Sequence, residues 1–140
     1  MAKIDFSGTD EAVRLMKKSD LFTEENIKRL LTVGTKILYD NISSAFITGN
    51  HIRTGATRRH LTRSRKVSRD KREVPYMYVT VTGKDDRKQK YNIKAFTANY
   101  GRRHGGKIRA TYYWSNAVQS TWRRANDSMA DEAARILKGQ

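Results

Sequence analysis

The chain has 140 residues and a formal net charge of +15, with 29 Lys and Arg against 14 Asp and Glu. This length predicts a single domain (1–140) with one hydrophobic core. The absence of cysteine excludes a disulfide framework, a thiolate nucleophile and a Cys-ligated zinc site. The first residues lack the apolar core of a signal peptide, and no apolar run reaches the roughly 18 residues of a membrane span. We therefore expect no membrane contact and a cytoplasmic location, or one in a particle assembled there.

The positive charge is concentrated in the middle of the chain. Residues 51–109 carry eighteen Lys and Arg against four Asp and Glu, a net +14. Residues 1–50 are balanced at seven against seven, and residues 110–140 carry four against three. A charge block of this kind attracts acidic partners and says little about the fold. The central block therefore predicts the binding surface, and the two ends predict the packed core.

The N-terminal third is predicted to be helical. Within the N-terminal segment 1–22, a short helix is expected near Asp10–Lys18, and Thr23 is a suitable N-cap for a second helix that ends at Thr48. At about 1.5 Å per residue, this second helix is about 39 Å long. Its apolar residues recur at three- and four-residue steps, which indicates one buried stripe. They are Ile27, Leu30, Leu31, Gly34, Ile37, Leu38, Ile42, Ala45 and Phe46. Gly49 and Asn50 are expected to end the helix.

The C-terminal segment repeats this pattern and predicts a second long helix, which ends before Gly139. Its stripe contains Trp and Met, which are more common in cores than in cofactor pockets, so we interpret it as a packing face. The stripe consists of Trp114, Val118, Thr121, Trp122, Ala125, Met129, Ala133, Ile136 and Leu137.

Between the helices the period of the apolar residues changes to two. Residues 76–82 alternate Tyr and Thr with Met and Val, which predicts a half-buried strand. Gly83–Lys90 is predicted as a turn, Tyr91–Tyr100 as the second strand of a hairpin, and Leu61–Val67 as a third strand. The fold class is therefore α+β, with a long N-terminal helix and a C-terminal helix packed on a small antiparallel sheet.

Two basic segments fit neither the helices nor the core. Residues 62–75 are charged almost throughout, and Val67 is their one strongly apolar side chain before Val74. They predict a flexible extended arm or a long hairpin. The second segment, GRRHGGKIRA at Gly101–Ala110, combines three glycines with basic side chains and predicts an irregular loop.

The sequence gives little support to catalysis. His51, His60 and His104 have no metal-ligand spacing and are interpreted as surface or loop residues. Asp85 and Asp86 lie beside Arg87 and are expected to serve turn formation and charge balance. GRRHGG does not match a phosphate-binding loop, because the order of its residues differs from the P-loop motif. We therefore predict no enzyme, no catalytic or metal-binding residue and no cofactor.

Nucleic acid is one acidic partner that the central block predicts. Lys and Arg neutralise phosphates, and Tyr76, Tyr78 or Phe96 would stack on bases if they faced outward. No helix-turn-helix, zinc finger or RNA-binding sheet motif is present. Sequence-independent binding of DNA or RNA therefore remains an alternative to a role in protein assembly.

Two further stretches carry a resemblance to a known family. IRTGATRRHL follows the long amphipathic helix, and AFTANYGRRHGGKIRATYYWSNAV leads into the final helix. Their order resembles that of the small tail-completion and head-to-tail joining (neck) proteins of long-tailed bacteriophages, over roughly residues 23–138.

The resemblance assigns positions residue by residue. It places Thr54 and Gly55, preceded by Arg53, at a Thr-Gly turn, and a glycine there suits a positive φ. It places Leu61 at a strand start, Tyr100 and Gly101 at the end of a strand, and residues 114–117 at the start of the last helix. The chain departs from the pattern at Asn99, where an acidic residue is usual, and at Tyr112–Trp114, where Pro-Phe is common.

The resemblance implies a structural protein of the virion neck or tail, assembled in the host cytoplasm. Such proteins form a ring, typically a hexamer, that joins portal and head-completion proteins to tail-tube or tail-terminator proteins, with DNA passing through the lumen. Duplex DNA across a domain roughly 37 Å wide presents about 20 phosphates, whereas six copies of the +14 block carry about 84 positive charges. We therefore expect most cations to face protein partners. The partner-binding set is Arg58, Arg59, Arg63, Arg65, Lys66, Arg69, Lys71 and Arg72, and the DNA-facing set is Arg102, Arg103, Lys107 and Arg109.

Overall fold

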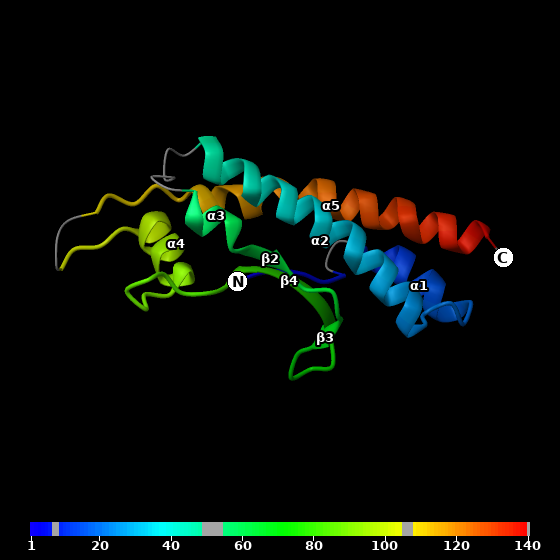
Figure 1. Ribbon diagram of the computed structural model, residues 1–140. Helices are drawn as coiled ribbons and strands as arrows, with labels where there is room; N and C mark the ends of the chain where they lie inside the picture. Colours follow the sequence, from blue (N-terminus) through cyan, green and yellow to red (C-terminus); the bar gives the residue numbers. More distant parts are fainter. Residues whose placement is uncertain (7–8, 49–54, 105–107, 140) are drawn as a thin grey trace.

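The computed structural model describes residues 1–6, 9–48, 55–104 and 108–139. It is an α+β structure in which two long helices lie side by side along one face of a small antiparallel sheet (Figure 1). The elements in chain order are β1 (Ala2–Ile4), α1 (Asp10–Lys18), α2 (Glu24–Thr48), α3 (Ala56–Arg59), β2 (Leu61–Arg63), β3 (Ser68–Arg69), β4 (Pro75–Val81), α4 (Tyr91–Tyr100) and α5 (Tyr113–Lys138).

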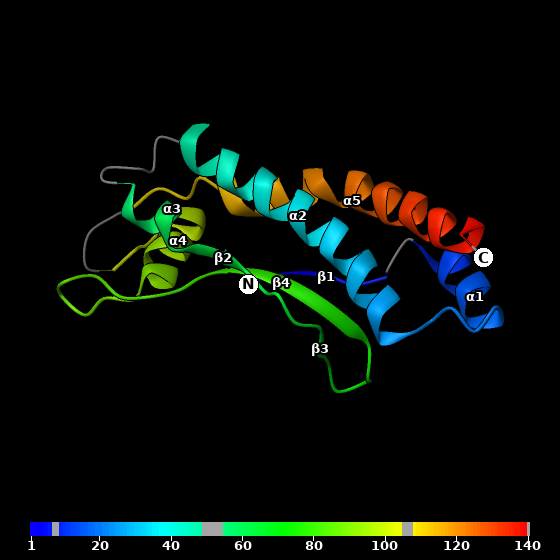
Figure 2. The same ribbon diagram turned by 45° about the vertical axis from the view of Figure 1, so that its right-hand side comes forward.

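The predicted helices α1, α2 and α5 are all confirmed. The backbone N–H of Asn26 donates to Thr23 Oγ1 at 3.2 Å, as expected for an N-cap of α2. Gly34 brings α2 close to its neighbours, because a Cβ there would lie 2.5 Å from Met129 Sδ and 2.7 Å from Ile4 Cγ2. The periodic apolar stripes therefore meet, and α2 and α5 form a continuous helical pair (Figure 2).

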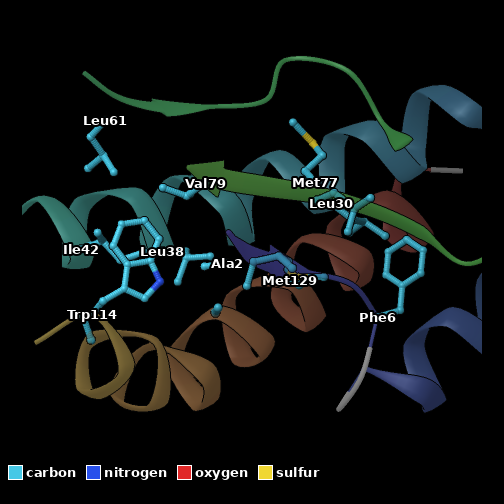
Figure 3. Packing of buried hydrophobic residues seen from close by; sticks show 14 of the residues in the cluster. Ala2, Phe6, Leu30, Leu38, Ile42, Leu61, Met77, Val79, Trp114 and Met129 are labelled. Carbon is cyan, nitrogen blue, oxygen red and sulfur yellow. The ribbon is translucent and has the colours of Figure 1, made fainter. Parts of the chain in front are cut away.

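The sheet is built around β4. β1 and β2 flank it in the order β1-β4-β2, and β3 also pairs with β4. The alternation predicted for β4 is confirmed, because Pro75, Met77, Val79 and Val81 are buried whereas the residues between them are half-buried. The buried face lies against the helices, where Met77 and Val79 join the core with Leu30, Leu38 and Met129 (Figure 3).

Two expectations for the strands need correction, and one strand was not expected. Tyr91–Tyr100 is a helix, α4, and not a strand. Its buried residues Ala95 and Asn99 are one helical turn apart, and the Tyr113 hydroxyl donates to the Ala95 carbonyl at 3.1 Å, so contacts with α5 outweigh the strand preference of the local sequence. The strand expected over Leu61–Val67 ends at Arg63, and β1 was not predicted because three residues show no period.

Candidate interaction surfaces

The basic segment 62–75 forms a hairpin, the second of the two expected alternatives. Arg63 pairs with Val79 and Ser68 with Tyr76, so five residue steps on one side match three steps on β4. The two extra residues make a bulge between β2 and β3. Arg65 and Lys66 are exposed in this bulge. The bulge therefore presents two cations between two paired segments.

The tip of the hairpin is held by Asp70. Its Oδ1 accepts the backbone N–H groups of Arg72 at 2.8 Å and Val74 at 3.0 Å. These hydrogen bonds, that of Val74 first, hold the pKa of the Asp70 carboxyl below its usual value. Arg69 forms an ion pair with Glu24 at the start of α2. The tip therefore contacts α2, and the side chains of Lys71 and Arg72 in the tip are exposed.

The loop between β4 and α4 has the turn chemistry expected for Asp85. Its Oδ1 accepts the backbone N–H groups of Arg87 at 2.9 Å and Gln89 at 2.8 Å, and its Oδ2 is paired with Lys94. The hydrogen bond from Lys94, followed by that from the Gln89 backbone, holds the pKa of the Asp85 carboxyl below its usual value. The loop leads into a helix, whereas a strand was expected.

Asn99 joins α4 to α5. It is fully buried, and its Oδ1 accepts the backbone N–H groups of Trp114 at 2.9 Å and Ser115 at 3.2 Å. Its Nδ2 donates to Ser115 Oγ at 2.9 Å. The N-cap residue of α5, Tyr112, makes no side-chain cap hydrogen bond. Asn99 therefore caps α5 from the preceding helix, a role that the sequence pattern does not reveal.

Gly101 ends α4 and turns the chain into the basic loop. Its φ is +79°, and a Cβ there would lie 2.6 Å from the Ile108 carbonyl oxygen. Arg102 and Ile108 exchange two backbone hydrogen bonds of 2.9 Å, so the ends of the loop form a small ladder. The Tyr100-Gly101 pair thus ends a helix, and its prediction as the end of a strand was wrong.

A groove lies beside α4. It has a volume of about 610 Å³ and is walled by the β4–α4 loop, one face of α4 and the ladder. Its lining residues are Lys88, Gln89, Lys90, Ile93, Lys94, Thr97, Ala98, Arg102 and Ile108. The described part of the lining contains four cations, no carboxylate and no aromatic ring. We call its aliphatic lining residues, Ile93, Ala98 and Ile108, the floor and its four cations the rim. The sequence does not reveal this groove, because the pattern of residues 91–100 indicates a strand where the structure has α4.

Exposed apolar side chains are frequent in the same stretch of the chain. Among the large exposed hydrophobic residues of the described chain, four of eight lie between positions 93 and 112. Ile93 and Tyr100 are each 61% exposed, and Ile108 and Tyr112 are also exposed. Ile93 and Ile108 both line the groove, and exposed apolar surface of this kind commonly marks a contact surface.

The remaining predicted site residues are distributed around these elements. Gly55 has a φ of +68°, as expected for the turn, and is the N-cap residue of α3. Leu61 begins β2 as predicted. Arg58 and Arg59 are exposed on α3 and line a second pocket of about 570 Å³, which also contains the carboxylates of Asp85 and Asp86.

Arg102, Arg103 and Arg109 are exposed in the loop after α4. Three of the predicted site residues, namely Arg53, Thr54 and Lys107, lie outside the described residues, as do the helix stop at Gly49 and Asn50 and one of the histidines, His51.

The two described histidines lie in different surroundings. His60 stacks on Tyr91 with ring centroids 4.3 Å apart, and His104 is exposed. In the described ranges, no group of three His, Cys, Asp or Glu side chains could hold a metal ion.

The two basic regions lie at opposite ends of α2. Glu24 at its start pairs with the hairpin, whereas Phe46 near its end contacts Tyr113 of the α4–α5 junction, with ring centroids 5.0 Å apart. A helix of 25 residues spans about 37 Å at 1.5 Å per residue. Figure 1 shows the β3 hairpin and the loop after α4 at separate places on the molecule.

The open face of the sheet carries two aromatic rings. Tyr76 and Tyr78 alternate with the buried residues of β4, so they lie on the face opposite the helices. Their ring centroids are 6.3 Å apart, and Lys3 Nζ lies 4.4 Å from the centroid of the Tyr76 ring. Phe96, in contrast, is half-buried against Trp114.

Comparisons with protein-family models, with curated proteins and with solved structures find no match to this chain. Among the described helices, none has the length and apolar character needed to cross a membrane.

Proposed function

We propose that this chain is a non-catalytic structural protein of a long-tailed bacteriophage, which joins the portal and head-completion proteins to the tail tube or tail terminator. The observation that carries the proposal is the placement of two basic surfaces at opposite ends of α2. One is the hairpin with Arg65, Lys66, Lys71 and Arg72, and the other is the region of α4 and its following loop. A protein that bridges two partners needs two contact surfaces on a rigid body, and the packed pair α2–α5 supplies such a body.

The proposal includes a ring of about six copies with DNA passing through the lumen, as the resemblance implies. The positive charge exceeds the phosphates of the enclosed duplex about fourfold, so most cations face acidic protein surfaces. Of the described cations expected to face DNA, Arg103 and Arg109 keep that assignment, whereas Arg102 lines the groove beside α4. The protein is expected in the virion neck or tail, and in the host cytoplasm during assembly.

The test is complementation of a bacteriophage that lacks this protein, with matched variants of the chain. The hairpin variant replaces Arg65, Lys66, Lys71 and Arg72 with Ser, because these exposed side chains are not needed for the pairing of β2 and β3 with β4. We expect separate filled heads and tails in electron micrographs of the lysate, since the contact with an acidic neighbour is lost.

The control variant removes the same number of charges from exposed helix positions. It replaces Lys18, Lys36, Arg123 and Arg124 with Ala. Joined, infectious particles are expected with this variant. If the hairpin variant also yields joined particles, the hairpin is not one of the two partner-binding surfaces.

Nucleic-acid binding is a second candidate, which the exposed sheet face favours. Tyr76 and Tyr78 meet the condition for base stacking, because they lie on the face away from the helices. This candidate predicts binding of short single strands or duplexes with a steep salt dependence, weakened by Tyr78→Ala. Absence of binding at about 150 mM salt in a fluorescence anisotropy titration would exclude it.

A further inference from the structure

We propose that the groove beside α4 binds an acidic segment of a partner protein that carries aliphatic side chains. This inference rests on the proposed function, because it names the chemistry of one partner of the joining protein. The groove has a volume of about 610 Å³, within the range of about 300–1,000 Å³ that natural binding pockets occupy. The chemistry of the bound segment follows from the floor, the rim and the rigidity of the groove.

The floor of the groove is aliphatic. Ile93 and Ala98 come from one face of α4, and Ile108 faces them from the ladder. Ile93 is 61% exposed although it is a large apolar residue. Covering such a side chain lowers the free energy of binding by about 25 cal/mol for each Å² of apolar surface removed from water. An aliphatic side chain of a partner is therefore the best match to the floor.

The rim of the groove is positively charged. Lys88, Lys90, Lys94 and Arg102 line it, and the described lining has no carboxylate. Lys94 forms an ion pair with Asp85, so its charge is partly neutralised. The neighbouring pocket, in contrast, combines cations with Asp85 and Asp86. Charge complementarity therefore selects Asp or Glu side chains around the aliphatic anchor.

The walls are held in place before a partner binds. Asp85 fixes the β4–α4 loop through two backbone hydrogen bonds, and the two bonds between Arg102 and Ile108 fix the ladder. Asn99 ties α4 to α5. A site that is ordered in advance loses little conformational entropy on binding.

Nucleic acid and a second copy of this chain fit the groove less well. Bases bind by stacking on aromatic rings, and none is among the described lining residues. Within the described part of the chain, no helix is acidic enough to complement the rim. In α1, for example, Asp10 and Glu11 are outnumbered by Arg14, Lys17 and Lys18. An acidic protein segment is therefore the occupant that the chemistry favours.

The test uses a labelled synthetic peptide of about 12 residues, which consists of Asp and Glu with two central leucines. It stands for a short acidic helix or strand of the partner. Its anisotropy is measured with the full chain at about 150 mM salt. A matched peptide carries serine in place of both leucines. We expect the leucine peptide to bind at least about tenfold more tightly.

Two variants locate the site. Ile93→Ser should reduce binding of the leucine peptide to the level of the serine peptide, because it removes the exposed floor residue. Leu15→Ser, at an exposed apolar position on α1, should leave binding unchanged.

The inference is overturned if both peptides bind equally, if Ile93→Ser has no effect, or if a DNA strand of equal charge displaces the leucine peptide. It is also overturned if sedimentation shows a dimer that Ile93→Ser dissociates, since the groove would then bind a second copy. Head-to-tail joining is scored separately on particles, so peptide binding can fail while the proposed function stands.

Discussion

Replacing Asn99 with Leu tests how α4 is fixed to α5. The two side chains are similar in size, but Leu offers no acceptor to the N–H groups of Trp114 and Ser115, which Asn99 Oδ1 binds at 2.9 and 3.2 Å. Asn99 and Trp114 are both buried, so water does not replace the acceptor of the Trp114 N–H, whereas Ser115 is half-buried and its N–H loses less. Each buried unsatisfied donor costs about 1–3 kcal/mol. We expect the free energy of unfolding to fall by about 2–4 kcal/mol, after allowance for the desolvation of the amide itself.

The assay is urea and thermal unfolding followed by circular dichroism. For a chain of this length, about 3–4 °C is lost per kcal/mol, so the melting temperature should fall by roughly 6–16 °C. Asn99→Asp is the matched control, because it keeps an acceptor and places a negative charge at the start of α5. It should lose less stability than Asn99→Leu at neutral pH, because the two backbone N–H groups offset part of the cost of burying the charge. Equal stability of Asn99→Leu and the parent, or equal losses in both variants, would refute the capping role of Asn99.

Three further predictions concern the fold and the hairpin. Gly101→Ala should destabilise the chain by about 1–3 kcal/mol in urea unfolding, because a positive φ and the Ile108 carbonyl both oppose a Cβ; an unchanged midpoint would contradict the observed turn. Gly34→Val should cost about 1–3 kcal/mol through overlap with Met129, and calorimetry would detect it as a lower melting temperature. The pKa of Asp70 is lowered in the folded chain. The stabilisation by its carboxylate is therefore present at pH values above the ordinary pKa of 3.8, and it is lost as the pH falls through the lowered pKa. The urea midpoint of the parent should therefore fall more steeply below about pH 4 than that of Asp70→Asn, and parallel curves would argue against this role.

The sequence predicts the long elements because each has one strong period. The apolar stripe of α2 and the alternation in β4 both arise from burial of one face, and burial is what the structure shows for them. The cap at Thr23 and the positive φ of Gly55 were also predictable from local chemistry.

The region of α4 could not be predicted in the same way. Tyr91, Ile93 and Phe96 prefer strands, whereas Ala95 and Asn99 are buried by residues of α5 that lie far along the chain. The groove depends on this helix and on the ladder at Arg102, so it was not visible in the sequence. The charge of the hairpin was evident, but the bulge that presents Arg65 depends on the register with β4.

The location of the protein in the particle tests the central proposal most directly. Purified particles can be labelled with an antibody fragment against this chain and examined by electron microscopy, with the copy number measured by quantitative mass spectrometry. We predict label at the junction of head and tail and about six copies per particle, the number that closes a ring of this kind. Absence of the chain from purified particles, or label on the capsid shell or the tail tip alone, would contradict a joining role.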